Sequence, residues 1–166
     1  MKKILYGGLL AAILLMPAFV ARAEGLDLDP YRGKVVYLDF WASWCSPCLQ
    51  SFPWMKTMQE AYGGEGLVIV AVNVDRQRAA ADAFLRRTTP NFAVLYDAEN
   101  KLFDHYQLIG MPTALLFDRQ GVLRARHVGW RAEQRATYEA EIKALLREKA
   151  GQATPAGVRA AAVAAP

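Results

Sequence analysis

The two cysteines of the chain, Cys45 and Cys48, are separated by only two residues. They follow an apolar run and stand where a helical pattern begins. Pro47 directly precedes the second cysteine, and its fixed φ and missing N–H suit the first turn of a helix. Two thiols at this spacing can close and reopen a disulfide, so the pattern predicts thiol–disulfide exchange.

The position of each cysteine predicts a different reactivity. Unpaired N–H groups at a helix start stabilise an anion, so we expect the Cys45 thiol to have a lowered pKa and to form the thiolate, which is the attacking species. Cys48 lies one turn further on, within reach of Cys45 and more deeply buried.

Two other uses of the pair are a structural metal site and a structural disulfide. A structural zinc site needs four ligands, and the only two histidines, His105 and His127, have no ligand spacing and are expected on the surface or rim. A structural disulfide closing so short a loop would stabilise the fold only weakly. A non-enzymatic metal-binding or redox-sensing module stays an alternative.

No charged side chain occurs between Trp41 and Met55. Three tryptophans in or near this stretch, Trp41, Trp44 and Trp54, predict an aromatic rim that suits another polypeptide better than a charged metabolite. The alternative is that Trp41 belongs to the core and Trp54 packs on the helix.

The pair must be positioned by strands and helices that alternate along the chain. Apolar runs predict strands over 35–41, 67–74, 92–96, 113–117 and 122–128, and helical patterns predict helices over 46–62, 76–87, 100–106 and 132–149. We expect Pro53 to kink its helix, Asp75 to cap the next one, and Asp118–Gly121 to turn a hairpin whose last strand is a charged edge. The fold class is therefore α/β, with a mixed sheet covered by helices on both faces.

The ends of the chain differ from this pattern. Lys2 and Lys3, an apolar stretch over 4–16 and the Ala21-Arg22-Ala23 site predict a signal peptide over 1–23, with an uncleaved anchor as the alternative. Its removal takes away three basic residues and no acidic one, which lowers the net charge from +4 to +1. No basic stripe indicates nucleic acid.

The remaining chain divides into one domain and a tail. Residues 24–150 are long enough for one domain, and 151–166 form an Ala-rich segment that we expect to be disordered.

The stretch Asp39-Phe-Trp-Ala-Ser-Trp-Cys-Ser-Pro-Cys48 closely resembles the active-site segment of the thioredoxin superfamily, and Ile109-Gly-Met-Pro112-Thr resembles its cis-proline loop. Within the superfamily the chain is most similar to the TlpA/ResA-like exported disulfide reductases. The signal peptide, the Phe-Pro-x-Met form of residues 52–55 and the extra helix–strand unit over 76–96 carry this likeness. The chain departs from it at Ser51, where many of these proteins have Glu, and at Leu49, where they often have a basic residue.

The resemblance implies a three-layer thioredoxin fold and a role for each site residue. Cys45 attacks, Cys48 resolves, Trp44 flanks the disulfide, and Met111 beside a cis Pro112 offers backbone hydrogen bonds to a bound peptide. The resemblance also places Asp39 beside Cys48.

Asp39 interrupts an apolar strand, and a carboxyl in such surroundings has a raised pKa. A neutral acid of this kind could exchange the proton of the resolving thiol. The alternative is a partly hydrated, structural aspartate at the end of the strand.

Together these observations predict an exported, periplasmic thiol:disulfide oxidoreductase that reduces disulfides of partner proteins, apocytochrome c or other exported chains among them. It needs no organic cofactor and no metal, but it needs a membrane electron donor. A disulfide-forming oxidase is the alternative, because the same residues can run backwards. The Ser46-Pro47 dipeptide resembles reducing centres more than oxidising ones.

Overall fold

The computed structural model describes residues 25–148. The predicted signal peptide over 1–23 and the predicted tail over 151–166 lie outside the described residues, so both stay predictions.

One five-stranded mixed sheet forms the centre of the molecule. Its strands are β1 (Val35–Trp41), β2 (Leu67–Asn73), β3 (Ala93–Tyr96), β4 (Thr113–Phe117) and β5 (Leu123–Val128). They lie in the order β3-β2-β1-β4-β5. The first three strands are parallel, while β4 and β5 are antiparallel to their neighbours. The central strand β1 is buried at every position, which explains its nearly continuous apolar sequence.

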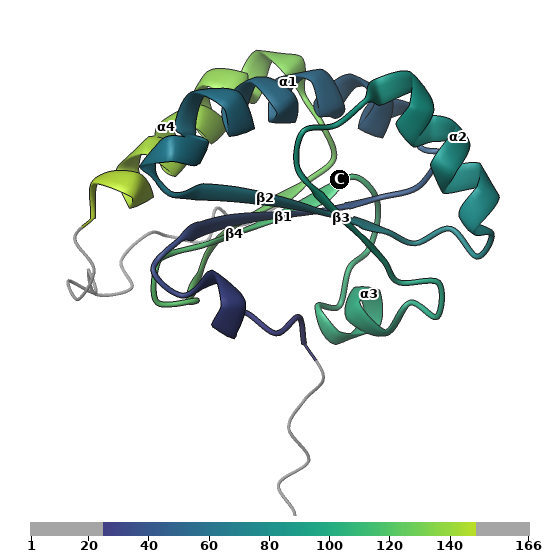
Figure 1. The fold of residues 1–166 in the computed structure, drawn as a ribbon, viewed down its shortest axis with the longest axis horizontal. Helices are drawn as coiled ribbons and strands as arrows, with labels where there is room; N and C mark the ends of the chain where they lie inside the picture. Colours follow the sequence, from purple (N-terminus) through teal and green to yellow (C-terminus); the bar gives the residue numbers. More distant parts are fainter. Residues whose placement is uncertain (1–24, 149–166) are drawn as a thin grey trace, which may run out of the picture.

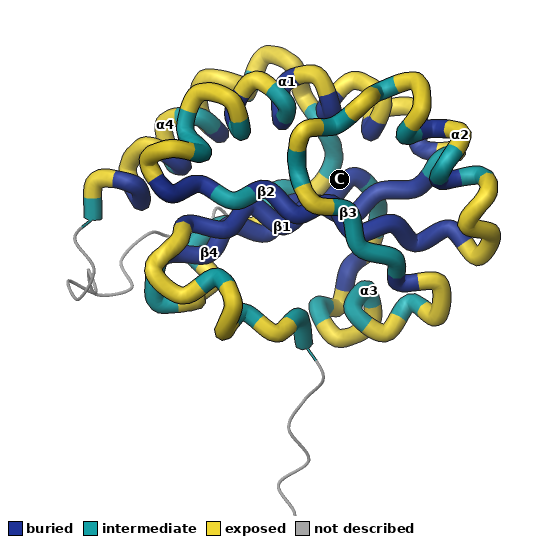
Figure 2. Tube along the Cα trace, in the orientation of Figure 1, coloured by how far each residue is buried: buried dark blue, intermediate teal, exposed yellow. Residues whose placement is uncertain are grey.

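Helices cover both faces, as predicted. Figure 1 shows α1 (Ser46–Tyr62), α2 (Arg78–Thr88) and α4 (Arg135–Arg147) over one face and the short α3 (Lys101–His105) over the other. Short 3-10 turns occupy 29–31, 63–65 and 132–134. The buried residues concentrate on the strands and on the sheet-facing sides of the helices (Figure 2). This arrangement confirms the thioredoxin-like α/β fold.

Alternation along β1 decides what each of its side chains meets. Tyr37 packs edge-on against Trp54 of α1, and Trp41 packs against Phe52 of the same helix. Phe40 points to the opposite face, where its ring contacts Phe103 of α3. Asp39 shares the parity of Tyr37 and Trp41, so it lies on the α1 face.

Most predicted helix and strand boundaries agree with the structure to within a residue, but two helices begin later than predicted. The helix expected from residue 76 begins at Arg78, and its N-cap residue Gln77 makes no side-chain cap. The prediction that Asp75 caps this helix is wrong, because its carboxylate is engaged elsewhere. The final helix starts with a 3-10 turn before α4 proper begins at Arg135. Helix α1 runs through Pro53, and the predicted kink stays a prediction.

The predicted hairpin and charged edge are confirmed. Asp118 accepts from the backbone N–H groups of Gln120 and Val122, and Gly121 adopts a positive φ of 78°. The edge strand β5 carries Arg124, whose guanidinium binds both Asp118 and Glu148.

Candidate redox site

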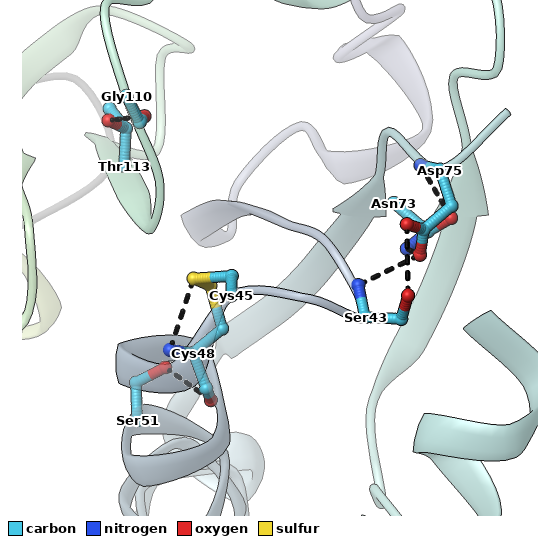
Figure 3. The surroundings of a disulfide bond; sticks show 8 residues. All are labelled: Ser43, Cys45, Cys48, Ser51, Asn73, Asp75, Gly110 and Thr113. Atoms are coloured by element: carbon cyan, nitrogen blue, oxygen red, sulfur yellow. Dashed lines mark hydrogen bonds between the residues drawn. A yellow bond between two sulfur atoms is a disulfide. The ribbon is translucent and has the colours of Figure 1, made fainter. Parts of the chain in front are cut away.

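The cysteine pair lies at the start of α1 and is joined as a disulfide (Figure 3). Cys45 is the N-cap residue, and its Sγ accepts a hydrogen bond from the backbone N–H of Cys48 over 3.3 Å. Cys48 is fully buried and Cys45 is 5% exposed, which agrees with the predicted difference in depth. A thiolate on Cys45 would face the N–H groups of the first turn, where an anion is stabilised.

The turn before Cys45 is held by residues for which no role in the site was predicted from the sequence. The carboxylate of Asp75 accepts from the backbone N–H of Ser43 over 2.8 Å and from its hydroxyl over 3.0 Å. The Asn73 amide donates to the same carboxylate over 2.8 Å. Three converging donors explain why Asp75 does not cap α2. The available signal was the polar pair Asn73 and Asp75 at the end of an apolar strand.

The Gly110–Thr113 loop contains the predicted cis peptide bond, between Met111 and Pro112. The Thr113 hydroxyl donates to the Gly110 carbonyl over 2.6 Å, and Gly129 N–H donates to the Pro112 carbonyl over 2.8 Å. Pro112 is buried, whereas Met111 is half-buried. These bonds fix the loop from both sides.

Met111 and Trp44 line one cleft of about 680 Å³. Residues of α2 and α3 complete its walls, and Asp75 and the exposed Arg76 and Asp104 also line it. The structure therefore places two of the three predicted substrate-binding residues, Trp44 and Met111, on one cleft, while Pro112 is buried behind Met111 in the loop.

The three tryptophans have different environments, which corrects the expected aromatic rim. Trp44 is 71% exposed, as a docking residue would be. Trp41 is fully buried against Phe52 and Phe84, and Trp54 is 8% exposed and packs on the ring of Tyr37. Trp41 and Trp54 thus belong to the core, because Phe84 of α2 packs on Trp41 of β1 and Tyr138 of α4 packs on Trp54 of α1.

Asp39 is buried without compensation. It is 2% exposed, and its Oδ2 has no hydrogen-bonding partner. Its neighbours in register on β2 and β4 are the alanines Ala71 and Ala114, which have no polar side chain. Burial therefore raises the pKa of Asp39 well above its usual value. The raised pKa is as predicted, and an exposure of 2% argues against a carboxyl open to solvent at the end of the strand, while the role of Asp39 in proton transfer stays a prediction.

The two histidines take no part in the disulfide site. His105 is exposed on α3 and stacks edge-on against Tyr106. His127 is more covered than expected: its side chain is 15% exposed, and its Nε2 lies 2.8 Å from Glu141 Oε2. Neither of those two atoms has another hydrogen-bonding partner. Within residues 25–148, no three His, Cys, Asp or Glu side chains are grouped as metal ligands.

Ser51, the position at which the chain departs from the TlpA/ResA-like pattern, is buried, and its hydroxyl donates to the Cys48 carbonyl over 3.1 Å.

Over the described part of the chain, no helix is both long and apolar enough to cross a bilayer.

Two relatives match this chain over more than half of its length. The "Thiol-disulfide oxidoreductase ResA" of Bacillus subtilis is 34% identical over 108 residues, which cover 63% of this chain and 60% of that protein. The protein of the same name from Geobacillus kaustophilus is 33% identical over 97 residues, covering 58% and 56%. The matched region is thus less than two thirds of the length of these relatives.

Solved structures agree on the fold. A crystal structure from Chlorobium tepidum, described as a thiol:disulfide interchange protein DsbE, is 44% identical with a TM-score of 0.70, and the match covers 72% of this chain and 84% of that one. StoA from Bacillus subtilis, at 22% identity and a TM-score of 0.57 over 66% and 84% of the two chains, shares the fold.

One protein-family model matches a region that includes both the Cys45–Cys48 disulfide and the Pro112 loop. The model of the Redoxin family matches residues 15–142, which is more than half of the chain. The chain therefore belongs to the Redoxin family.

Proposed function

We propose that this protein is a thiol:disulfide oxidoreductase that reduces disulfides in partner proteins. One observation carries the proposal: a Cys45–Cys48 disulfide sits at the N-terminus of α1. The names of the ResA relatives support the same activity.

The reaction begins with the reduced dithiol. The Cys45 thiolate attacks one sulfur of the partner's disulfide, the partner's other sulfur leaves as a thiolate, and a mixed disulfide forms. The Cys48 thiolate then attacks the Cys45 sulfur, and the partner's second sulfur leaves. Two electrons pass to the partner, whose thiolates take up protons, and Cys45–Cys48 is left oxidised.

Asp39 is proposed as the acceptor of the Cys48 proton in the second step. A buried thiol needs a base nearby before it can attack, and Asp39 lies on the face of β1 that α1 covers. Its raised pKa makes its carboxylate a stronger base than an exposed aspartate.

The substrate is proposed to be an extended segment of another protein. Trp44 offers an exposed aromatic surface on one side of the cleft, and the backbone of Met111 offers hydrogen bonds on the other. Partners of this kind include apocytochrome c and other exported proteins.

Export to the periplasm is proposed from the signal peptide pattern, with anchoring if that segment is not cleaved. An exported reductase cannot reach cytosolic reductants, so a membrane protein must supply its electrons.

An insulin-reduction assay tests the activity. The wild-type protein should accelerate insulin precipitation with dithiothreitol as electron source, and Cys45→Ser should abolish the acceleration. A wild-type protein no faster than dithiothreitol alone would overturn the proposal.

The reduction potential of Cys45–Cys48 tests the direction. Equilibration in glutathione buffers should give a value near about −270 mV, as in thioredoxin, whereas a value near about −120 mV would identify a disulfide-forming oxidase.

A further inference from the structure

The hydrogen bonds around Ser43 join the redox turn to the end of β2 (Figure 3). Two of them come from Ser43 itself, one from its backbone N–H and one from its hydroxyl, and both end on the carboxylate of Asp75. Asp75 is 8% exposed and Ser43 is partly buried, so these bonds are partly sheltered from water. Hydrogen bonds to a charged acceptor are stronger than those between neutral groups.

Asp75 is itself held rigidly. Its backbone N–H donates to the Asn73 side chain over 3.1 Å, and the amide of that side chain donates back to the carboxylate over 2.8 Å. Asn73 is fully buried in β2 and lies in register with Trp41 of β1. The N–H of Val74 also donates to the Trp41 carbonyl over 3.0 Å. The carboxylate is thus anchored to the centre of the sheet.

The turn that Asp75 holds leads directly into the nucleophile. Cys45 N–H donates to the Ala42 carbonyl over 3.1 Å, which closes a four-residue turn with Ser43 and Trp44 at its centre. The orientation of Ser43 therefore sets both the exposed indole of Trp44 and the approach of Cys45 to α1.

We propose that Asp75 is a positioning residue for Cys45: it holds the Ser43 turn so that the Cys45 sulfur lies at the N-terminus of α1, in reach of Cys48. The inference rests on the proposed function. A structural role for Asp75 in α2 does not explain these bonds, because the N-cap residue of that helix is Gln77 and has no side-chain cap.

The proposal has a consequence for redox equilibrium. In glutathione the disulfide reacts with two GSH to give the Cys45–Cys48 dithiol and GSSG. A turn that holds Cys45 near Cys48 lowers the entropy lost when the disulfide closes. The Asp75 carboxylate is bonded to Ser43, two residues before Cys45, and its negative charge also disfavours the thiolate of the reduced form. Both effects favour the disulfide, so loss of Asp75 should make it easier to reduce.

The test compares Asp75→Ala with Asp118→Ala. Asp118 is a matched control, because it is also a buried aspartate (4% exposed) that follows a strand and accepts backbone N–H groups, but it lies in the β4–β5 hairpin. Asp75→Ala should shift the equilibrium with glutathione toward the dithiol by about fivefold, or about 20 mV at 29.6 mV per tenfold. Asp118→Ala should lower the melting temperature without moving this equilibrium.

Ser43→Ala gives a second measurement if Asp75→Ala fails to fold. It removes the hydroxyl bond to Asp75 and leaves the Asp75 charge in place, so a shift of about twofold in the same direction is expected. Ser43→Thr keeps the hydroxyl and should restore the wild-type equilibrium. If Asp75→Ala folds and its equilibrium with glutathione equals that of the wild type, the proposal is overturned. If Asp75→Ala does not fold, a wild-type equilibrium in Ser43→Ala overturns it. The glutathione equilibrium needs no protein substrate, so an absence of insulin reduction would count against the proposed function alone.

Discussion

Replacing Asp39 by Asn should make the protein more stable at neutral pH and slower as a reductase. Asp39 is almost completely buried, and its Oδ2 has no hydrogen-bonding partner. Burial raises the pKa of Asp39, so the folded protein holds this proton in a range of pH where the unfolded chain has released it. Asn has nearly the same shape and never ionises, so the variant escapes this loss.

The sign and size of the stability change follow from this difference. Below about pH 4, the ordinary pKa of Asp, the carboxyl is protonated in both folded and unfolded states, and the two proteins should be alike. As the pH rises, the wild-type protein loses free energy of unfolding until the pH passes the raised pKa of the folded state. Each pH unit above the ordinary pKa adds about 1.4 kcal/mol to the difference until the raised pKa is reached, so a gain on the order of 1 kcal/mol or more is expected at pH 7, or at least roughly 3–5 °C in melting temperature.

Thermal unfolding of the oxidised protein between pH 4 and pH 8 measures the effect, since the disulfide removes titrating thiols. Asp97→Asn is the matched control: Asp97 is also buried, but its Oδ2 accepts from the N–H of Phe103, so no gain is expected. If the melting temperatures of Asp39→Asn and the wild type differ by the same amount at pH 4 and at pH 8, the explanation by the raised pKa of Asp39 is refuted.

The same variant tests the proposed role in proton transfer. Loss of a general base typically costs 10²–10⁴-fold, so release of the partner from a preformed mixed disulfide should slow by at least about tenfold. Release at the wild-type rate would make Asp39 a structural residue only.

Three further substitutions separate binding from folding. Trp44→Ala should raise KM for reduced-insulin formation several-fold and leave the melting temperature unchanged, because this side chain is 71% exposed; a lower melting temperature with unchanged KM would contradict its docking role. Phe84→Ala should cost about 3–5 kcal/mol in urea unfolding, since its ring packs against Trp41 and Phe52 in the core; a loss under 1 kcal/mol would refute that packing. Gln59→Ala should cost about 1–3 kcal/mol by the same assay, because its side-chain amide makes two hydrogen bonds with the backbone of β2; an unchanged midpoint would show that water replaces them.

The fold was largely predictable because its strands and helices have strong local patterns. The run of buried residues in β1 and the Gly121 turn were both evident from residue types. The place of each cysteine on α1 also followed from sequence, since Pro47 marks the first turn.

The environment of the tryptophans could not be predicted with the same ease. Trp41 and Trp44 are three residues apart in an uncharged segment, and only the strand's end at Trp41 decides that one is buried and the other exposed. Long-range packing by Phe84 of α2 covers Trp41, and no local pattern encodes that contact.

The bond between Ser43 and Asp75 shows a similar limit. These residues are 32 positions apart, and an aspartate before a helical pattern is a strong local signal for a cap. The parallel pairing of β1 and β2 brings the ends of both strands together, so the carboxylate meets Ser43 instead.

The most direct test of the account is to locate the mixed disulfide. Reduced Cys48→Ser protein should be incubated with oxidised insulin, and the trapped adduct should be digested without reductant and mapped by mass spectrometry. The account predicts a stable adduct on Cys45, and no adduct when reduced Cys45→Ser is used. An adduct on Cys48 in the Cys45→Ser protein, with none on Cys45 in the other variant, would contradict the assignment of the attacking cysteine.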